Sequence, residues 1–234
     1  MVAVVVTLLA MAIAGGAADA PVTSEEGLAL AIVFDTSGSM GEAVKDNAGV
    51  MAPKHVIARR ALNTILDRLK DYQAKAPANV PRNIHAGLVM FDNGRARIAV
   101  PFGPFHAEAM RDWLKHFSGP SGNTPLGQAV QVASLELLKT KLSHKHVLVI
   151  TDGINTTGEK PEQVIPRMKR QADRQNTGLS LHFVAFDVDA RLFDPLKKLG
   201  VTVVGAADAK QLNDQLEFIV EKKILLEDEE PKKK

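Results

Sequence analysis

An uninterrupted apolar run, Leu28 to Phe34, passes directly into the polar pattern Asp35-x-Ser37-x-Ser39. A short run that is apolar at every position is typical of a strand covered on both faces, as in a parallel sheet flanked by helices. The carboxylate and two hydroxyls that follow it are hard oxygen ligands, the kind that Mg²⁺ or Mn²⁺ prefers. This segment therefore predicts a buried strand with a cation site at its end.

Further apolar runs alternate with segments of helical periodicity, which is typical of βα units stacked into a mainly parallel sheet. The second and third of these runs are separated only by residues 92–95, too few for a crossover, so they should form an antiparallel hairpin with the third at an edge. We expect strands at 28–34, 84–91, 96–101, 146–150, 181–186 and 201–204.

Apolar residues at helical spacing predict amphipathic helices between these strands. A terminal helix is expected over about 208–226, with Asp208 and Gln211 placed as a capping box. The two clearest earlier stripes, which we interpret as core packing, are Val56, Ile57, Leu62, Ile65, Leu66 and Leu69, and Leu126, Val130, Ala133, Leu137 and Leu138.

The overall composition is ordinary for a globular protein of this length. The 234 residues carry 29 Lys and Arg against 27 Asp and Glu, interspersed, so nucleic acid is an unexpected partner. Cysteine is absent, which excludes disulfides, thiolate zinc sites and a cysteine nucleophile.

The N-terminal segment predicts export. Residues 2–16 are apolar, and Ala18-Asp19-Ala20 fits an A-x-A cleavage pattern, so we expect a signal peptide at 1–20 and a periplasmic or extracellular protein. Because no Lys or Arg precedes the apolar stretch, retention as a membrane anchor and a buried N-terminal strand stay open as alternatives. We expect a linker at 21–27, one domain at 28–226 and a charged tail at 227–234.

Two further segments should converge on the Asp35 turn. The fourth predicted strand ends in Thr151-Asp152-Gly153, which brings a second carboxylate to the same sheet edge. Between them, Ser121 to Gly127 supplies a glycine-flanked Thr124, with Pro125 suited to the first position of the next helix. Ligands of open α/β sheets bind outside the carboxyl ends of the strands. We therefore expect one cation site there.

These three elements, in this order, resemble those of the von Willebrand factor A-type domain with its metal-ion-dependent adhesion site, over about residues 28–226. The resemblance implies a Rossmann-like, doubly wound, six-stranded sheet of order 3-2-1-4-5-6 that carries one Mg²⁺ or Mn²⁺. It also implies that Ser37 and Ser39 bind the ion directly, that Thr124 joins them when the site is occupied, and that Asp35 and Asp152 act directly or through water.

Neutral hydroxyls leave such an ion strongly electrophilic, which favours capture of an anion over turnover. We therefore expect a non-catalytic module that binds a partner protein through an exposed Asp or Glu, with membrane contact only if residues 1–20 are retained. One alternative is a scaffold or assembly subunit with a structural or vestigial metal site. Another is a Mg²⁺-dependent phosphohydrolase of the haloacid-dehalogenase type, but Ser37 stands where those enzymes need a carboxylate.

Weaker candidates lie elsewhere in the chain. His144 and His146 have a spacing that suits zinc, but we interpret them as solvated residues at the entry of a strand. We interpret Asp187, Asp189 and Asp194 as turn and cap residues, with an acidic rim of the site as the alternative. The aromatic residues before Thr124, namely Phe105, Trp113 and Phe117, are expected in the core, although part of them could line a groove for a partner.

Overall fold

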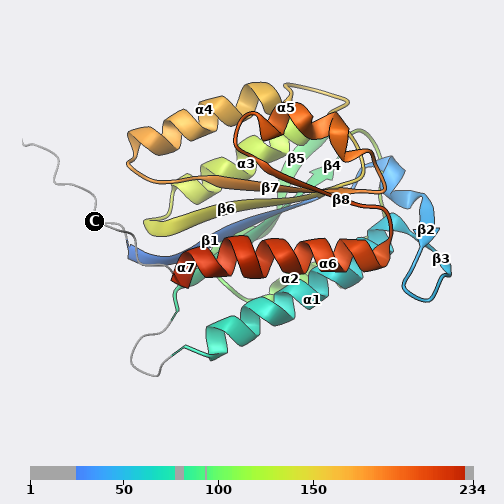
Figure 1. The fold of residues 1–234 in the computed structure, drawn as a ribbon, viewed down its shortest axis with the longest axis horizontal. Helices are drawn as coiled ribbons and strands as arrows, with labels where there is room; N and C mark the ends of the chain where they lie inside the picture. The colour runs from blue at the N-terminus through green and yellow to red at the C-terminus, as the bar shows by residue number, and fades with distance from the viewer. Residues whose placement is uncertain (1–24, 77–81, 93, 230–234) are drawn as a thin grey trace, which may run out of the picture.

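The computed structural model describes residues 25–76, 82–92 and 94–229. They form one six-stranded sheet with helices on both faces (Figure 1). The predicted signal peptide at 1–20 and the last residues of the predicted tail lie outside this part of the chain. None of the helices in these ranges is long and apolar enough to cross a membrane.

The sheet has the strand order predicted from the sequence, β5-β4-β1-β6-β7-β8. All neighbouring strands are parallel except β4 and β5, which form the antiparallel edge hairpin. The Rossmann-like α/β fold is thus confirmed. The strands are β1 (Glu25–Phe34), β4 (Ile84–Asp92), β5 (Arg95–Pro104), β6 (Leu142–Thr151), β7 (Ser180–Phe186) and β8 (Thr202–Ala206).

Two layers of helices cover the two faces of the sheet (Figure 1). One layer contains α1 (Lys54–Ala74), α2 (Ala107–His116) and the C-terminal helix, which runs through α6 (Ala209–Ile219), the π-helical η3 (Val220–Leu225) and α7 (Leu226–Glu229). The other contains α3 (Leu126–Leu138), α4 (Pro161–Arg174), the 3-10 turn η2 (Ala190–Phe193) and α5 (Asp194–Lys197).

Strand β1 shows why the sequence folds in this way. Its even positions, such as Ile32 and Phe34, enter the core beneath α1 and α6, whereas Ala31 and Val33 enter the core beneath α3. Each of these side chains is at most 2% exposed. An apolar residue is therefore required at every position from Leu28 to Phe34, where both faces of this central strand are buried, whereas Glu25 and Glu26 at its start are exposed.

Several boundaries differ from those predicted. β1 begins at Glu25, inside the expected linker, and the C-terminal helix continues to Glu229, into the expected tail. β6 begins at Leu142 instead of His146, because its polar first half is paired and buried like the rest. Helix α3 begins at Leu126, so Pro125 is its cap and does not occupy its first turn.

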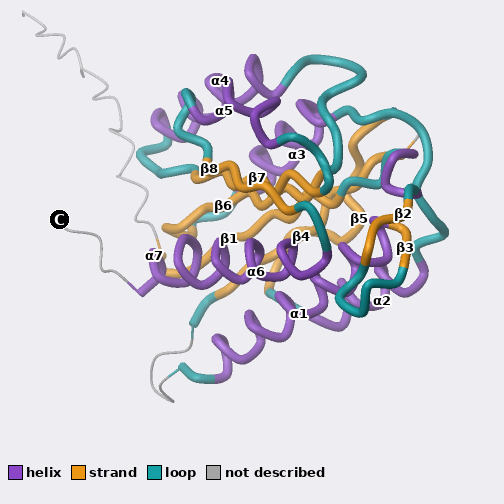
Figure 2. Tube along the Cα trace, turned by 45° about the vertical axis from the view of Figure 1, so that its right-hand side comes forward, coloured by secondary structure: helices purple, strands orange, loops and turns teal. Residues whose placement is uncertain are grey.

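A small hairpin that was not predicted follows the Asp35 turn. After the 3-10 turn η1 (Gly38–Gly41), strands β2 (Ala43–Lys45) and β3 (Met51–Pro53) pair antiparallel and lead into α1. Figure 2 shows this hairpin beside the start of α1, on the opposite side of the molecule from α7. Its strands are only three residues each, too short to give a periodic signal in the sequence.

Candidate functional site

The turn after β1 and the turn after β6 lie side by side at one edge of the sheet. Phe34 is in register with Ile150, and the backbone N–H of Asp35 donates to the Ile150 carbonyl at 3.0 Å. This pairing places Asp35 beside Asp152, which follows β6. The sheet thus brings together two carboxylates that are far apart in the sequence.

Asp35 is fully buried, and both of its carboxylate oxygens accept hydrogen bonds. Oδ1 accepts from the backbone N–H of Ser37 at 2.8 Å, and Oδ2 accepts from the Thr151 hydroxyl at 2.6 Å. Burial raises the pKa of Asp35 to about 6, although these hydrogen bonds oppose the shift. The carboxylate is therefore held rigidly in a site that disfavours an uncompensated negative charge.

A short chain of hydrogen bonds joins the two serines to Asp152. The hydroxyl of Ser39 donates to Asp152 Oδ1 at 2.8 Å and lies 3.2 Å from the hydroxyl of Ser37. Ser37 and Asp152 are buried, at 1% and 6% exposed. Three of the oxygen-bearing side chains predicted for the site are therefore joined in one hydrogen-bonded series, with Ser39 in the middle.

The loop that carries Thr124 packs directly against the Asp35 turn. The Gly38 N–H donates to the Gly122 carbonyl at 3.0 Å, and the Ser121 N–H donates to the Thr36 carbonyl at 2.8 Å. Thr124 itself is 4% exposed, and its N–H donates to the Thr156 hydroxyl at 2.8 Å. The loop is thus fixed on one side to the Asp35 turn and on the other to the segment after Asp152.

These oxygen donors suit a hard divalent cation more than zinc or a redox metal. Within residues 25–76, 82–92 and 94–229, no group of three or more His, Cys, Asp or Glu side chains is arranged to hold a metal ion. The predicted set differs in kind from such groups, because three of its members are hydroxyls. Its fit to Mg²⁺ or Mn²⁺ therefore depends on hydroxyl and carboxylate oxygens, of which those of Ser37, Ser39 and Asp152 form one hydrogen-bonded series.

Comparison with known proteins decides the family. The family model for the von Willebrand factor type A domain matches residues 29–223. The chain belongs to this family. A search of curated protein sequences found no match.

Solved structures share the VWA fold at low sequence identity. The PilB minor pilin from Streptococcus sanguinis is 16% identical with a TM-score of 0.65, and the match covers 88% of this chain and 63% of the pilin. Proximal thread matrix protein 1 from the mussel byssus, with a zinc-occupied MIDAS motif, is 15% identical with a TM-score of 0.60, over 84% of this chain and 48% of that one.

A third structure of the same fold is the manganese-loaded TRAP protein of Plasmodium vivax. It is 14% identical with a TM-score of 0.52, over 82% of this chain and 73% of that one. The VWA chain described here thus spans less than two thirds of the length of the pilin and of the byssus protein.

One charged residue beside the predicted site was missed by the sequence reasoning. Lys54, the first residue of α1, is 3% exposed, and its ammonium is surrounded by carboxylates. It lies 2.8 Å from Glu42 Oε2, 3.1 Å from Asp152 Oδ2 and 3.0 Å from Asp187 Oδ2. Burial lowers the pKa of Lys54, but these carboxylates outweigh burial and raise it above its usual value. No local pattern could reveal this cluster, since its members come from four separate segments.

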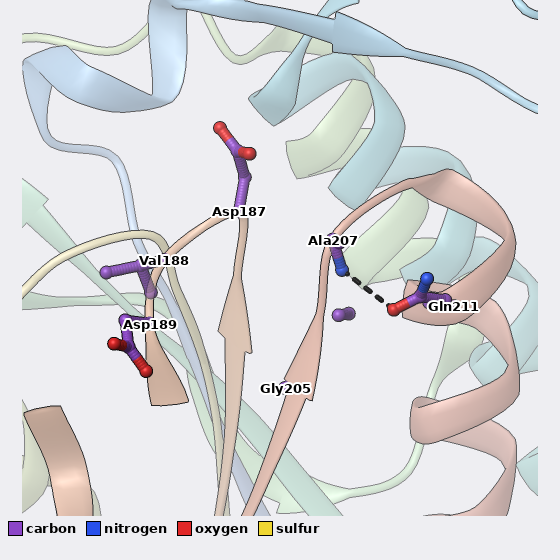
Figure 3. A pocket seen from close by; sticks show the side chains of 7 residues that line it. Asp187, Val188, Asp189, Gly205, Ala207 and Gln211 are labelled. Carbon is purple, nitrogen blue, oxygen red and sulfur yellow. Dashed lines mark hydrogen bonds between the residues drawn. The ribbon is translucent and has the colours of Figure 1, made fainter. Parts of the chain in front are cut away.

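A shallow cavity of about 540 Å³ adjoins this cluster, between the end of β7 and the start of α6 (Figure 3). Asp187 stands at its rim with positive φ, and its N–H donates to the Ala206 carbonyl at 2.7 Å. On the other side, Gln211 Oε1 accepts from the Ala207 N–H at 3.1 Å. The cavity is lined by Asp187, Val188, Asp189, Gly205, Ala206, Ala207 and Gln211.

The sequence left two interpretations of the aspartates after β7, namely turn and cap residues or an acidic rim of the site. Asp189 caps η2 by accepting from the Arg191 N–H at 3.0 Å, and Asp194 begins α5, where it lies 2.9 Å from Lys197. Asp187 instead forms an ion pair with Lys54. The cap interpretation is thus right for Asp189, and the position of Asp187 at an acidic rim of the site stays a prediction.

The interpretation of His144 and His146 as solvated residues is wrong. They are 4% and 0% exposed, because β6 is covered along its whole length. His146 stacks on His182 of β7 with Nδ1 3.2 Å from His182 Nε2. This pair lies toward the start of the strands, at the opposite end from Asp35.

Of the aromatic residues before Thr124, Phe105 lies in the core as expected, whereas Trp113 and Phe117 are only partly buried. Phe105 is 5% exposed, and Trp113 packs against Phe34 with ring centroids 5.9 Å apart. Trp113 and Phe117 also stack on each other at 5.3 Å. Both of them line a small cavity of about 220 Å³ that also includes Thr36 and Ser121. The alternative that part of these residues line a groove for a partner therefore stays open.

Proposed function

We propose that this VWA domain is a non-catalytic binding module that captures a protein partner through one divalent cation. In this proposal the ion is held by Asp35, Ser37, Ser39, Thr124 and Asp152, and a Glu or Asp of the partner completes its coordination. The observation that carries the proposal is the hydrogen-bonded series Ser37, Ser39 and Asp152 beside the buried carboxylate of Asp35.

The chemistry of these residues favours recognition. With hydroxyls supplying most of the donors, a bound Mg²⁺ or Mn²⁺ keeps much of its charge and attracts a further anion. The byssus protein has a zinc-occupied MIDAS motif and the TRAP protein is manganese-loaded, which supports a divalent cation as the ligand of this fold. Our choice of Mg²⁺ or Mn²⁺ for this chain rests on its oxygen donors.

Apolar side chains near the same edge support a protein as the partner. Val50 and Met51 on the β2–β3 hairpin are 60% and 59% exposed, and Ile154, two residues after Asp152, is 50% exposed. Large exposed apolar residues around a polar site are typical of protein interaction surfaces. We further propose that the chain acts outside the cytoplasm, as the Ala18-Asp19-Ala20 pattern predicts.

A pull-down from an extract of the native host tests this function. The immobilised chain should retain a partner in Mg²⁺, release it in EDTA and retain it again when Mg²⁺ is restored. Asp35→Ala should retain nothing under any of these conditions, whereas Asp189→Asn, a matched acidic control at the same sheet edge, should behave as the original chain does. A bona fide partner held equally well in chelator would rule out the cation bridge.

A scaffold or assembly subunit with a vestigial site is the second candidate, and one observation favours it. The ammonium of Lys54 already neutralises part of Asp152, so the acidic edge has an internal counter-charge. If this reading is right, titration with Mg²⁺ and Mn²⁺ gives neither heat nor stabilisation. A phosphohydrolase is less favoured, since Ser37 lacks the general-acid carboxyl, and a phosphatase screen with Mg²⁺ would detect one.

A further inference from the structure

Lys54 and the proposed cation compete for the same carboxylate. Asp152 accepts from the Ser39 hydroxyl through Oδ1 and lies 3.1 Å from the Lys54 ammonium through Oδ2. One oxygen therefore faces the hydroxyl donors of the proposed metal site, and the other faces a fixed positive charge. The Asp152 carboxylate itself is fully buried, so solvent does little to weaken either interaction.

The fold builds the position of Lys54 from both sides. The β2–β3 hairpin returns the chain so that the Lys54 N–H donates to the Glu42 carbonyl at 2.8 Å. Asp187, held in the left-handed region at φ 52°, contributes the third carboxylate from the end of β7. The ammonium is thus a tethered cation that links the turns after β6 and β7 to the segment after Ser39.

We infer that Lys54 is the resident counter-cation of this acidic edge, and that it sets the affinity of the neighbouring metal site. This inference rests on the proposed function for the identity of that site. Its charge stabilises the metal-free domain, because it separates Asp152 from Asp187 and Glu42. The same charge repels a divalent cation that binds Asp152, so it weakens metal binding. It also leaves the bound ion with a stronger attraction for a carboxylate from a partner.

The alternative role for Lys54 predicts the opposite result. If Lys54 acted only to orient Asp152, its removal would loosen a ligand and weaken metal binding. Asp152 has other support, however, because Oδ1 is bonded to Ser39 and the residue directly follows strand β6. The direction in which affinity changes therefore distinguishes a charge-setting residue from a positioning residue.

The test is a titration of Mg²⁺ and Mn²⁺ into the full chain and into Lys54→Met, which keeps most of the length of the side chain and removes its charge. We expect Lys54→Met to bind the cation at least about tenfold more tightly, equivalent to about 1.4 kcal/mol. In EDTA its Tm should fall below that of the original chain, and the cation should restore it. Lys54→Arg, which keeps the charge, should retain the original affinity.

Two further variants control for failure to fold and for the loss of a lysine elsewhere in the chain. Lys54→Met/Asp187→Asn removes one charge of each sign, so it should fold in EDTA even if the single variant does not, and it should still bind the cation more tightly. Lys169→Met removes a partly buried lysine that donates to the Leu199 carbonyl at 2.6 Å, and it should leave cation affinity unchanged.

The outcomes separate this inference from the proposed function. Tighter binding by both Lys54→Met variants supports the inference, and if the original chain then binds no cation, the proposed function alone fails. Equal or weaker binding by both variants overturns the inference while the original chain still binds its cation. Absence of binding in every variant overturns both.

Discussion

The hydroxyl of Ser39 donates a 2.8 Å hydrogen bond to the carboxylate of Asp152, although 113 positions separate the two residues. The contact exists because β1 and β6 are adjacent parallel strands that end at the same edge of the sheet. The proposed site depends on that adjacency, since the turn after β1 and the turn after β6 each supply only part of its oxygen donors. The fold thus acts here by bringing the ends of distant strands together.

Thr36, between the two polar positions Asp35 and Ser37, should be a structural anchor of the turn. Its hydroxyl donates to the Phe91 carbonyl and accepts from the Phe91 N–H, both at 2.9 Å, and the residue is 2% exposed. Thr36→Val leaves both backbone groups unpaired, so we expect the free energy of unfolding to fall by about 2–3 kcal/mol. Urea denaturation measures this loss. Thr36→Ser keeps the hydroxyl and should lose far less; equal losses would refute the role of the hydrogen bonds.

Gly127 in the first turn of α3 should tolerate no side chain. A Cβ at this position would lie 1.9 Å from the Glu159 carbonyl oxygen, which is backbone and cannot move aside cheaply. We expect Gly127→Ala to destabilise the domain by about 3 kcal/mol or more and to weaken cation binding, because α3 must move together with the Thr124 loop. Gly103→Ala, where the space is open, is the control for thermal unfolding. Similar Tm values for the two variants would contradict the close approach.

The buried histidine pair should make stability depend on pH. Burial, reinforced by Lys223, lowers the pKa of His182 from 6.5 to about 4, and burial with the nearby His182 and His144 lowers the pKa of His146 as well. As the pH falls below 6.5, these two histidines therefore bind protons in the unfolded chain but not yet in the folded chain. Stability is therefore full above pH 6.5 and is lost as the pH falls toward 4.

We expect the free energy of unfolding to be lower at pH 5 than at pH 7.5 by about 2 kcal/mol or more from this pair. Glu227 Oε2, 3.8 Å from His146 Nε2, is the nearby acidic group that offsets part of this loss. Urea denaturation at the two pH values should show a smaller difference for His182→Phe, while the exposed His116→Phe retains the full difference. An unchanged difference in His182→Phe would contradict the role of the pair.

The sequence predicted the central architecture because its signals are local. From Leu28 to Phe34, strand β1 is apolar at every position, and the short connection between β4 and β5 allows only a hairpin, so the central buried strand and the edge strand were predicted correctly. The strand order was implied by the resemblance to the von Willebrand factor A-type domain, and it is confirmed. The Asp35 turn, the Thr124 loop and Asp152 were likewise recognisable, since each carries its polar residues within a few positions. Their meeting at one edge followed from the general rule for open sheets.

The parts that could not be predicted depend on partners distant in the chain. The first half of β6 appeared too polar for a strand, but its Lys145 donates to the Thr177 hydroxyl at 2.9 Å and its histidines stack against β7. Lys54 resembled an ordinary first residue of a helix until the carboxylates of Glu42, Asp152 and Asp187 surrounded it. Such pairing becomes visible only after the fold has placed the partners.

Calorimetric titration of Mg²⁺ and of Mn²⁺ into the full chain and into Asp35→Ala tests the central claim most directly. Our account predicts one bound ion per chain for the original protein, with an increase in Tm on binding, and no binding for Asp35→Ala. Exposed Asp189→Asn should titrate like the original protein. Binding of equal strength in Asp35→Ala, or no binding of either ion to the original chain, would contradict the account.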